Sequence, residues 1–121
     1  MLIKSESRCP QFVANDGCKV RELMHPKNDG IDLAFSLAIA EVEPGNRTFR
    51  HRLSQTEVYY IVSGTGVVHI GNEQQRVTSG DAVLIGSSQV QWIENIGFDT
   101  LKFAALVSPP WRPESDENLE I

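Results

Sequence analysis

Between residues 31 and 107 the sequence is a series of short apolar runs, alternating or β-branched, separated by Gly, Ser and Asn. Apolar residues at every second position predict strands with one buried face, whereas an amphipathic helix repeats them every three or four residues. In the run over 31–42, for example, the bulky Leu37 and Ile39 alternate with the small Ala38 and Ala40. Alternate residues of a strand point to opposite faces, so we predict an all-β chain.

Turn residues divide this region into short strands. About eight to ten strands with tight connections predict a sandwich or a barrel, and periodicity alone leaves both open. The expected strands cover 31–42, 48–53, 57–62, 66–70, 74–77, 82–85, 89–94 and 100–107.

The chain of 121 residues is long enough for one domain with one core. We expect this β-domain over 31–108, with an N-terminal segment over 1–30 that packs on it. Residues 19–24 of that segment are predicted to form either a strand or a helical turn. In the Pro-rich, acidic C-terminal tail over 109–121, residues 109–113 should block regular structure, and the last few residues should be mobile.

The net charge of −5 and the scattered Lys and Arg residues give no basic stripe for a nucleic-acid backbone. The sequence has neither an N-terminal apolar run typical of a signal peptide nor a stretch long enough to span a membrane, so we expect a soluble, cytoplasmic protein. Cys9 and Cys18 lack metal-binding spacing and are expected to be free thiols.

His51 and Glu57 are the first candidates for chemistry. Six residues of extended strand span ~20 Å, so these side chains can meet only if the chain reverses between them. The polar residues 54–56 are where a hairpin could form. Without such a reversal, both would be ordinary exposed residues of a strand.

The segment from Gly45 to Gly64 resembles the first motif of the cupin superfamily, Gly-x5-His-x-His-x3-Glu-x6-Gly. His51 and Glu57 occupy motif positions, and Leu53 stands where the motif has its second histidine.

The second motif of that superfamily, Gly-x5-Pro-x-Gly-x2-His-x3-Asn, is similar to residues 80–95. Gly80 and Asn95 match its ends, while Gly86, Ser88 and Gln91 replace its proline, glycine and histidine. The resemblance implies an antiparallel double-stranded β-helix, the jelly-roll barrel of the cupins.

The resemblance also implies a metal site, whose four ligand positions fall here on His51, Leu53, Glu57 and Gln91. Leu53 cannot bind a metal ion, and the amide oxygen of Gln91 is a weak ligand. We therefore expect His51, Glu57 and Gln91 to hold a divalent ion weakly, in a site with open positions. These ligands do not distinguish Zn, Mn, Ni, Co and Fe.

The same residues permit a site without metal. Burial in an apolar barrel would raise the pKa of Glu57, which could then act as general base, with His51 as its catalytic partner and Gln91 positioning the ligand. The ligand would be a small polar metabolite, sugar-like or a carboxylate. Enzymes and non-catalytic binding or sensor proteins both fit this description. The pocket walls are expected to include Leu53, Tyr59, Phe49 and Ile93.

Tyr60 lies on the strand face opposite Glu57, and Trp92 on the face opposite Gln91. Apolar and aromatic side chains on an outer face favour association, so we expect a homodimer through an outer sheet that includes both. By the same alternation His69 faces outward. His25 is expected in a loop, from which an N-terminal segment folding over the barrel could bring it near the site.

Overall fold

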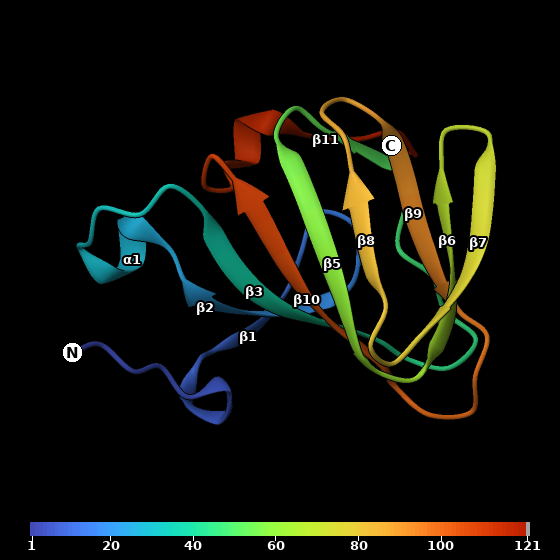
Figure 1. Ribbon diagram of the computed structural model, residues 1–121, viewed down its shortest axis with the longest axis horizontal. Helices are drawn as coiled ribbons and strands as arrows, with labels where there is room; N and C mark the ends of the chain where they lie inside the picture. The colour runs from blue at the N-terminus through green and yellow to red at the C-terminus, as the bar shows by residue number, and fades with distance from the viewer. Residues whose placement is uncertain (121) are drawn as a thin grey trace.

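The computed structural model describes residues 1–120, which form two antiparallel sheets that face each other (Figure 1). The strand order is β1-β2-β3-β10-β5-β8 in the six-stranded sheet and β11-β4-β9-β6-β7 in the five-stranded sheet. This is the predicted double-stranded β-helix. Its elements are β1 (Gln11–Val13), β2 (Lys19–Met24), α1 (Pro26–Asp29), β3 (Ser36–Val42), β4 (His51–Leu53), β5 (Thr56–Ser63), β6 (Thr65–Ile70), β7 (Glu73–Thr78), β8 (Ala82–Ile85), β9 (Val90–Asn95), β10 (Leu101–Ser108) and β11 (Asp116–Asn118), with 3-10 turns over Glu6–Arg8 and Pro113–Ser115.

Two of the expected strands begin three or more residues later than the alternation indicates. β3 starts at Ser36 rather than at residue 31, because its neighbour β2 ends at Met24, which lies opposite Leu37. β4 starts at His51 rather than at residue 48. Alternation shows which side chains share a face, whereas a strand also needs a paired neighbour.

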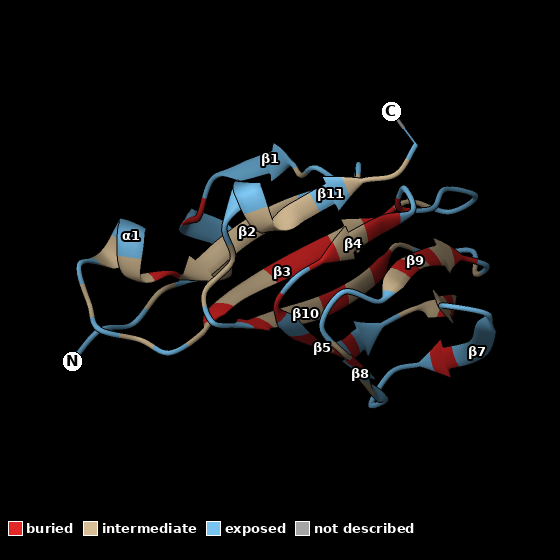
Figure 2. Ribbon diagram, turned by 90° about the horizontal axis from the view of Figure 1, so that it is seen from above, coloured by how far each residue is buried: buried red, intermediate tan, exposed pale blue. Residues whose placement is uncertain are grey.

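The core fills the space between the two sheets. Its fully buried side chains come from both sheets, and Figure 2 shows buried segments in red along the strands of each. The rings of Tyr59 and Phe103 lie 4.4 Å apart between their centroids. The largest fully buried side chains are Phe103, Ile61, Ile85, Ile93, Leu101, Gln91 and Thr48.

Gly64, the last residue of the first motif, has a structural role. Its φ angle is +92°, and a Cβ atom built there would lie 2.9 Å from the Cα of Leu101. A positive φ and so close a backbone are tolerated by glycine and by few other residues. This position therefore fixes the turn from β5 into β6.

The C-terminal tail is more ordered than the sequence indicates. Residues 116–118 form β11, which pairs with β4. The Glu120 carboxylate accepts hydrogen bonds from Arg47 Nη1 at 2.9 Å and from Nη2 at 2.6 Å. The acidic end thus adds a strand to the free edge of β4, which the sequence did not predict.

Tyr60 and Trp92 lie on outer faces as expected, but in different sheets. Tyr60 belongs to β5 of the six-stranded sheet and is 51% exposed. Trp92 belongs to β9 of the five-stranded sheet, where its ring stacks on His69 at 3.5 Å and Arg47 lies 5.1 Å from its centroid. Because they lie in different sheets, a single outer-sheet surface cannot contain both. The sequence could not predict this, since strand alternation does not reveal which sheet a strand joins.

Across the described residues, no helix is long and apolar enough to cross a membrane.

Candidate functional site

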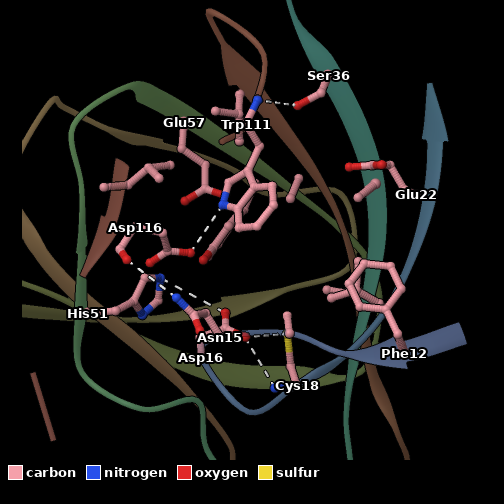
Figure 3. Close-up of a pocket in the computed structure, with 18 of the residues that line it drawn as sticks. Phe12, Asn15, Asp16, Cys18, Glu22, Ser36, His51, Glu57, Trp111 and Asp116 are labelled. Carbon is pink, nitrogen blue, oxygen red and sulfur yellow. Dashed lines mark hydrogen bonds and ion pairs between the residues drawn. The ribbon is translucent and has the colours of Figure 1, made fainter. Parts of the chain in front are cut away.

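A cavity of about 290 Å³ lies inside the barrel, and the close-up in Figure 3 shows the side chains around it. One part of its lining, here called the barrel wall, consists of His51, Leu53, Glu57 and Tyr59 on β4 and β5. Another part, the terminal wall, comes from segments near the two ends of the chain. It consists of Phe12, Asp16, Cys18, Trp111 and Asp116.

Strand register explains why the residues of the two motifs meet. His51 lies directly opposite Gln91, and paired residues of antiparallel strands point to the same face. After Leu53 the chain crosses to the other sheet, where β5 begins at Thr56, so Glu57 faces the cavity from the opposite side. The expected hairpin between β4 and β5 is not formed, since these strands do not pair. The reversal that brings the side chains together is a crossing between sheets.

Glu57, Gln91 and Tyr59 form a buried chain of hydrogen bonds. The Gln91 amide nitrogen donates to Glu57 Oε1 at 3.0 Å, and the Tyr59 hydroxyl donates to the Gln91 amide oxygen at 2.9 Å. Gln91 is 1% exposed and lies behind the other two. This network fixes the orientation of both the amide and the carboxyl group.

Burial is the main cause that raises the pKa of Glu57 to about 8; the Gln91 hydrogen bond opposes it, and the negative charges of Asp16 and Asp116 support it. At neutral pH the Glu57 carboxyl is therefore mostly protonated. Burial, with Glu57 as the next cause, also raises the pKa of Tyr59 well above its ordinary value. The phenol keeps its hydrogen and remains the donor to Gln91.

His51 is 4% exposed, and a backbone carbonyl just before β4 holds its ring. Its Nδ1 lies 2.8 Å from the carbonyl oxygen of Phe49. A carbonyl oxygen can only accept, so Nδ1 carries a hydrogen. Nε2 is the nitrogen on the cavity side, 3.9 Å from Asp16 Oδ2.

The terminal wall is acidic. Trp111 Nε1 donates to Asp116 Oδ2 at 3.1 Å, while the buried Asp116 Oδ1 has no hydrogen-bond partner in the described structure. Burial raises the pKa of Asp116, although the nearby His51 opposes this. The Cys18 thiol donates to Asp16 Oδ1 at 2.9 Å. Burial, followed by the charge of Asp16, raises the pKa of Cys18, which disfavours the reactive thiolate.

The trio expected to bind a metal ion does not fit that role as it is arranged. The amide oxygen of Gln91, its ligand atom, accepts the Tyr59 hydroxyl, and the amide nitrogen points at Glu57. Across residues 1–120, no three His, Cys, Asp or Glu side chains form a group able to hold a metal ion. Leu53, 3% exposed, occupies the remaining family position with an apolar side chain.

The other expected pocket residues have different positions. Leu53 and Tyr59 line the cavity. Ile93 is fully buried in the core cluster and does not line it. Phe49 is 43% exposed and packs near Gly17, outside the cavity, because it precedes β4 and the alternation of that strand does not extend to it.

His25 and His69 lie outside the cavity lining. His25 caps α1, and its Nε2 is 2.8 Å from the carbonyl oxygen of Trp111. The N-terminal segment thus contacts the terminal wall through His25. His69 Nε2 is 3.0 Å from Glu94 Oε1 on the outer side of the five-stranded sheet.

Sequence reasoning did not find the terminal wall. Asp116 reaches the cavity because β11 places it opposite Leu53. Asp16 is held by a backbone hydrogen bond of 2.7 Å from Phe49 N to its carbonyl oxygen. Neither contact has a local signal, since the paired residues are far apart in the sequence.

Comparison with known proteins gives a family match and two relatives. The family described as "Cupin domain" matches residues 38–107. An uncharacterized protein of Methanocaldococcus jannaschii is 36% identical over 121 residues, covering 98% of this chain and 96% of the relative. An oxalate-binding protein of Thermotoga maritima is 31% identical over 112 residues, covering 88% and 93%.

Solved structures show the same fold. The polyketide cyclase RemF from Streptomyces resistomycificus superposes with a TM-score of 0.83 at 20% identity, covering 100% of this chain and 87% of that one. A predicted oxalate decarboxylase from Thermotoga maritima superposes with a TM-score of 0.77 at 22% identity, covering 89% and 99%. At these identities the likeness concerns the fold alone.

Proposed function

This chain belongs to the cupin family, and we propose that its cavity binds a small organic molecule without a metal ion and that Glu57 exchanges a proton with it. The carrying observation is a buried carboxyl on the cavity wall, with a pKa of about 8, hydrogen-bonded to Gln91. A group whose pKa lies near the working pH can both give and take a proton.

Three residues of the barrel wall and the buried Gln91 behind them have distinct roles in this proposal. Oε1 of Glu57 accepts the hydrogen bond from Gln91, which leaves Oε2 for the ligand. Gln91 and Tyr59 are positioning residues, because they contact Glu57 or each other and are held inside the barrel. His51 offers Nε2 from the opposite sheet as a second proton acceptor.

The competing function is binding of a divalent ion by His51, Glu57 and Gln91. That site requires the Gln91 amide to turn its oxygen away from Tyr59 and toward Glu57. Elemental mass spectrometry and calorimetric titration with Mn²⁺ and Zn²⁺ distinguish the two functions. We expect the purified protein to carry no stoichiometric metal and to bind neither ion.

A gain-of-metal variant sharpens this test. Leu53→His with Gln91→His supplies the missing family ligands and should create Zn²⁺ or Mn²⁺ binding. The matched control makes the same changes at exposed positions, Leu84→His with Gln75→His, and should bind much more weakly. Stoichiometric metal in the natural protein that disappears in Glu57→Gln would overturn the metal-free proposal.

Ligand binding can be followed through Trp111, which lines the cavity. Trp92→Phe removes the other tryptophan. Three probes share one ring and differ in charge: benzylammonium, benzyl alcohol and benzoate. At least one should change the Trp111 fluorescence in a saturable way. Ala105→Leu, which fills the cavity, should abolish the fluorescence change, and Ala82→Leu on the outer face should leave it intact. The same fluorescence response in these two variants would contradict the proposal.

The homodimer stays a prediction, now restricted to the outer face of the six-stranded sheet. Tyr60, Val62 and Leu84 are exposed there, with Leu84 69% exposed. Light scattering at micromolar concentration checks it, and a monomer mass would contradict it.

A further inference from the structure

The charged groups around the cavity are almost all of one sign. Four carboxyl groups line it, Asp16, Glu22, Glu57 and Asp116, and since Glu57 is mostly protonated at neutral pH, the other three are the ones that can carry negative charge. No Lys or Arg side chain is found among the described lining residues. His51 is the one basic side chain of that lining, and its Nε2 lies beside Asp16 at 3.9 Å. It can offset at most one negative charge. A low-dielectric cavity with this lining attracts cations and repels anions.

The acidic side of the cavity also contains a buried hydrogen-bond acceptor that lacks a donor. The Trp111 and Cys18 donors are already used by Asp116 Oδ2 and Asp16 Oδ1. Asp116 Oδ1 is buried and has no donor in the described structure. At Glu57, which is 7% exposed, Oε1 already accepts from Gln91, so Asp116 Oδ1 is the acceptor of the described lining that lacks a partner. Buried acceptors without donors cost free energy, and a ligand with N–H groups would remove that cost.

Aromatic rings complete the lining. Trp111 and Phe12 belong to the terminal wall, and Tyr59 and Phe103 lie deeper between the sheets. Figure 3 shows Trp111 beside Asp116, joined to it by the indole hydrogen bond. Aromatic faces attract cations and also pack against apolar groups. The volume of about 290 Å³ suits a molecule with a single ring or a short alkyl chain.

From these observations we infer that the ligand is a small organic ammonium ion, with its N–H groups at Asp16 and Asp116 and its apolar body against Trp111 and Phe12. This inference rests on the proposed function and names the class of ligand for the same cavity. This ligand differs from the oxalate in the name of the Thermotoga maritima relative, because a dianion without hydrogen-bond donors would meet the carboxyl groups of Asp16 and Asp116.

The probe series tests the sign of the charge directly. In Trp92→Phe protein with a metal chelator present, we expect benzylammonium to bind about tenfold more tightly than benzyl alcohol, a difference typical of one partly buried ion pair. Benzoate and oxalate should give no saturable change. Benzoate or oxalate binding as tightly as benzylammonium would overturn the inference.

A matched pair of variants locates the interaction. Asp116→Asn should weaken benzylammonium about tenfold and leave benzyl alcohol unchanged, since it removes charge and keeps shape. Glu117→Gln removes the same charge from the exposed neighbouring position and should change the affinity for neither benzylammonium nor benzyl alcohol. Asp16→Asn should repeat the effect, so the test stands even where Asp116→Asn fails to fold. Equal weakening by Asp116→Asn and Glu117→Gln would show non-specific attraction and overturn the inference.

The two proposals fail in different ways. Saturable benzyl alcohol or benzoate binding that Ala105→Leu abolishes, without preference for benzylammonium, would overturn the ammonium ligand and leave the binding cavity standing. Absence of binding by every probe would overturn both.

Discussion

The barrel wall and the terminal wall of the cavity are built differently. In the barrel wall, side chains bond to one another inside the protein, as Glu57 and Tyr59 do through the buried Gln91. In the terminal wall, backbone contacts hold the segments in place, such as the 3.0 Å bond from Ser54 N to the Ser115 carbonyl oxygen. The barrel wall is therefore part of the core, whereas the terminal wall, apart from the buried Cys18, can change its side chains with little disturbance of packing. We assign proton exchange to the first and ligand selection to the second.

The largest expected effect tests the barrel wall through the pH dependence of the free energy of unfolding. The folded protein keeps the Glu57 proton up to a pKa of about 8, whereas the unfolded chain releases it near 4.5. The unfolded state then binds fewer protons across this window, so the free energy of unfolding falls as pH rises. Between about pH 5 and pH 8 the natural protein should lose on the order of 4 kcal/mol relative to Glu57→Gln.

Urea unfolding of both proteins across that pH range measures this difference. Glu117→Gln, at an exposed position, should keep the slope of the natural protein. Parallel curves for the natural protein and Glu57→Gln would mean that the Glu57 carboxyl is not held protonated, and the proton-exchange role would fail with it.

The next effect concerns the support behind Glu57. Gln91→Leu removes the donor to Glu57 and the acceptor of the Tyr59 hydroxyl, so two buried polar groups lose their partners. We expect about 3 kcal/mol of destabilisation, measured by urea unfolding at pH 5. Gln75→Leu, the same change at an exposed position of β7, should have little effect. Similar losses in the two variants would show that the network contributes nothing to stability.

The difference between the walls also explains how far the sequence could be used. His51, Glu57 and Gln91 were found because motif spacing and strand alternation depend on the local geometry of the chain. The role of Gln91 as a positioning residue could not be predicted, because the hydrogen bond from Tyr59 determines which way its amide points. Asp16 and Asp116 were missed because their places depend on Phe49 and on the pairing of β11 with β4. Likewise, the outward faces of Tyr60 and Trp92 followed from alternation, and their separate sheets did not.

The smallest effect tests the terminal wall. Trp111→Phe keeps an aromatic face toward the cavity and removes the hydrogen bond to Asp116 Oδ2. Water can reach this wall once the bond is lost, so we expect a cost of only about 1 kcal/mol in urea unfolding. Because that bond lowers the pKa of Asp116, its loss should raise that pKa further, and benzylammonium should bind more weakly to a carboxyl that is protonated more often.

Trp92→Phe, on the outer side of the five-stranded sheet, is the control and should leave benzylammonium binding, followed by calorimetry, unchanged. The pH slope that depends on Glu57 should survive in Trp111→Phe, since the barrel wall keeps its own hydrogen bonds. A loss of stability in Trp111→Phe as large as that in Gln91→Leu would show that Trp111 is part of the hydrophobic core. The terminal wall could then no longer be treated as a replaceable surface, and ligand selection and barrel stability would have to be explained together.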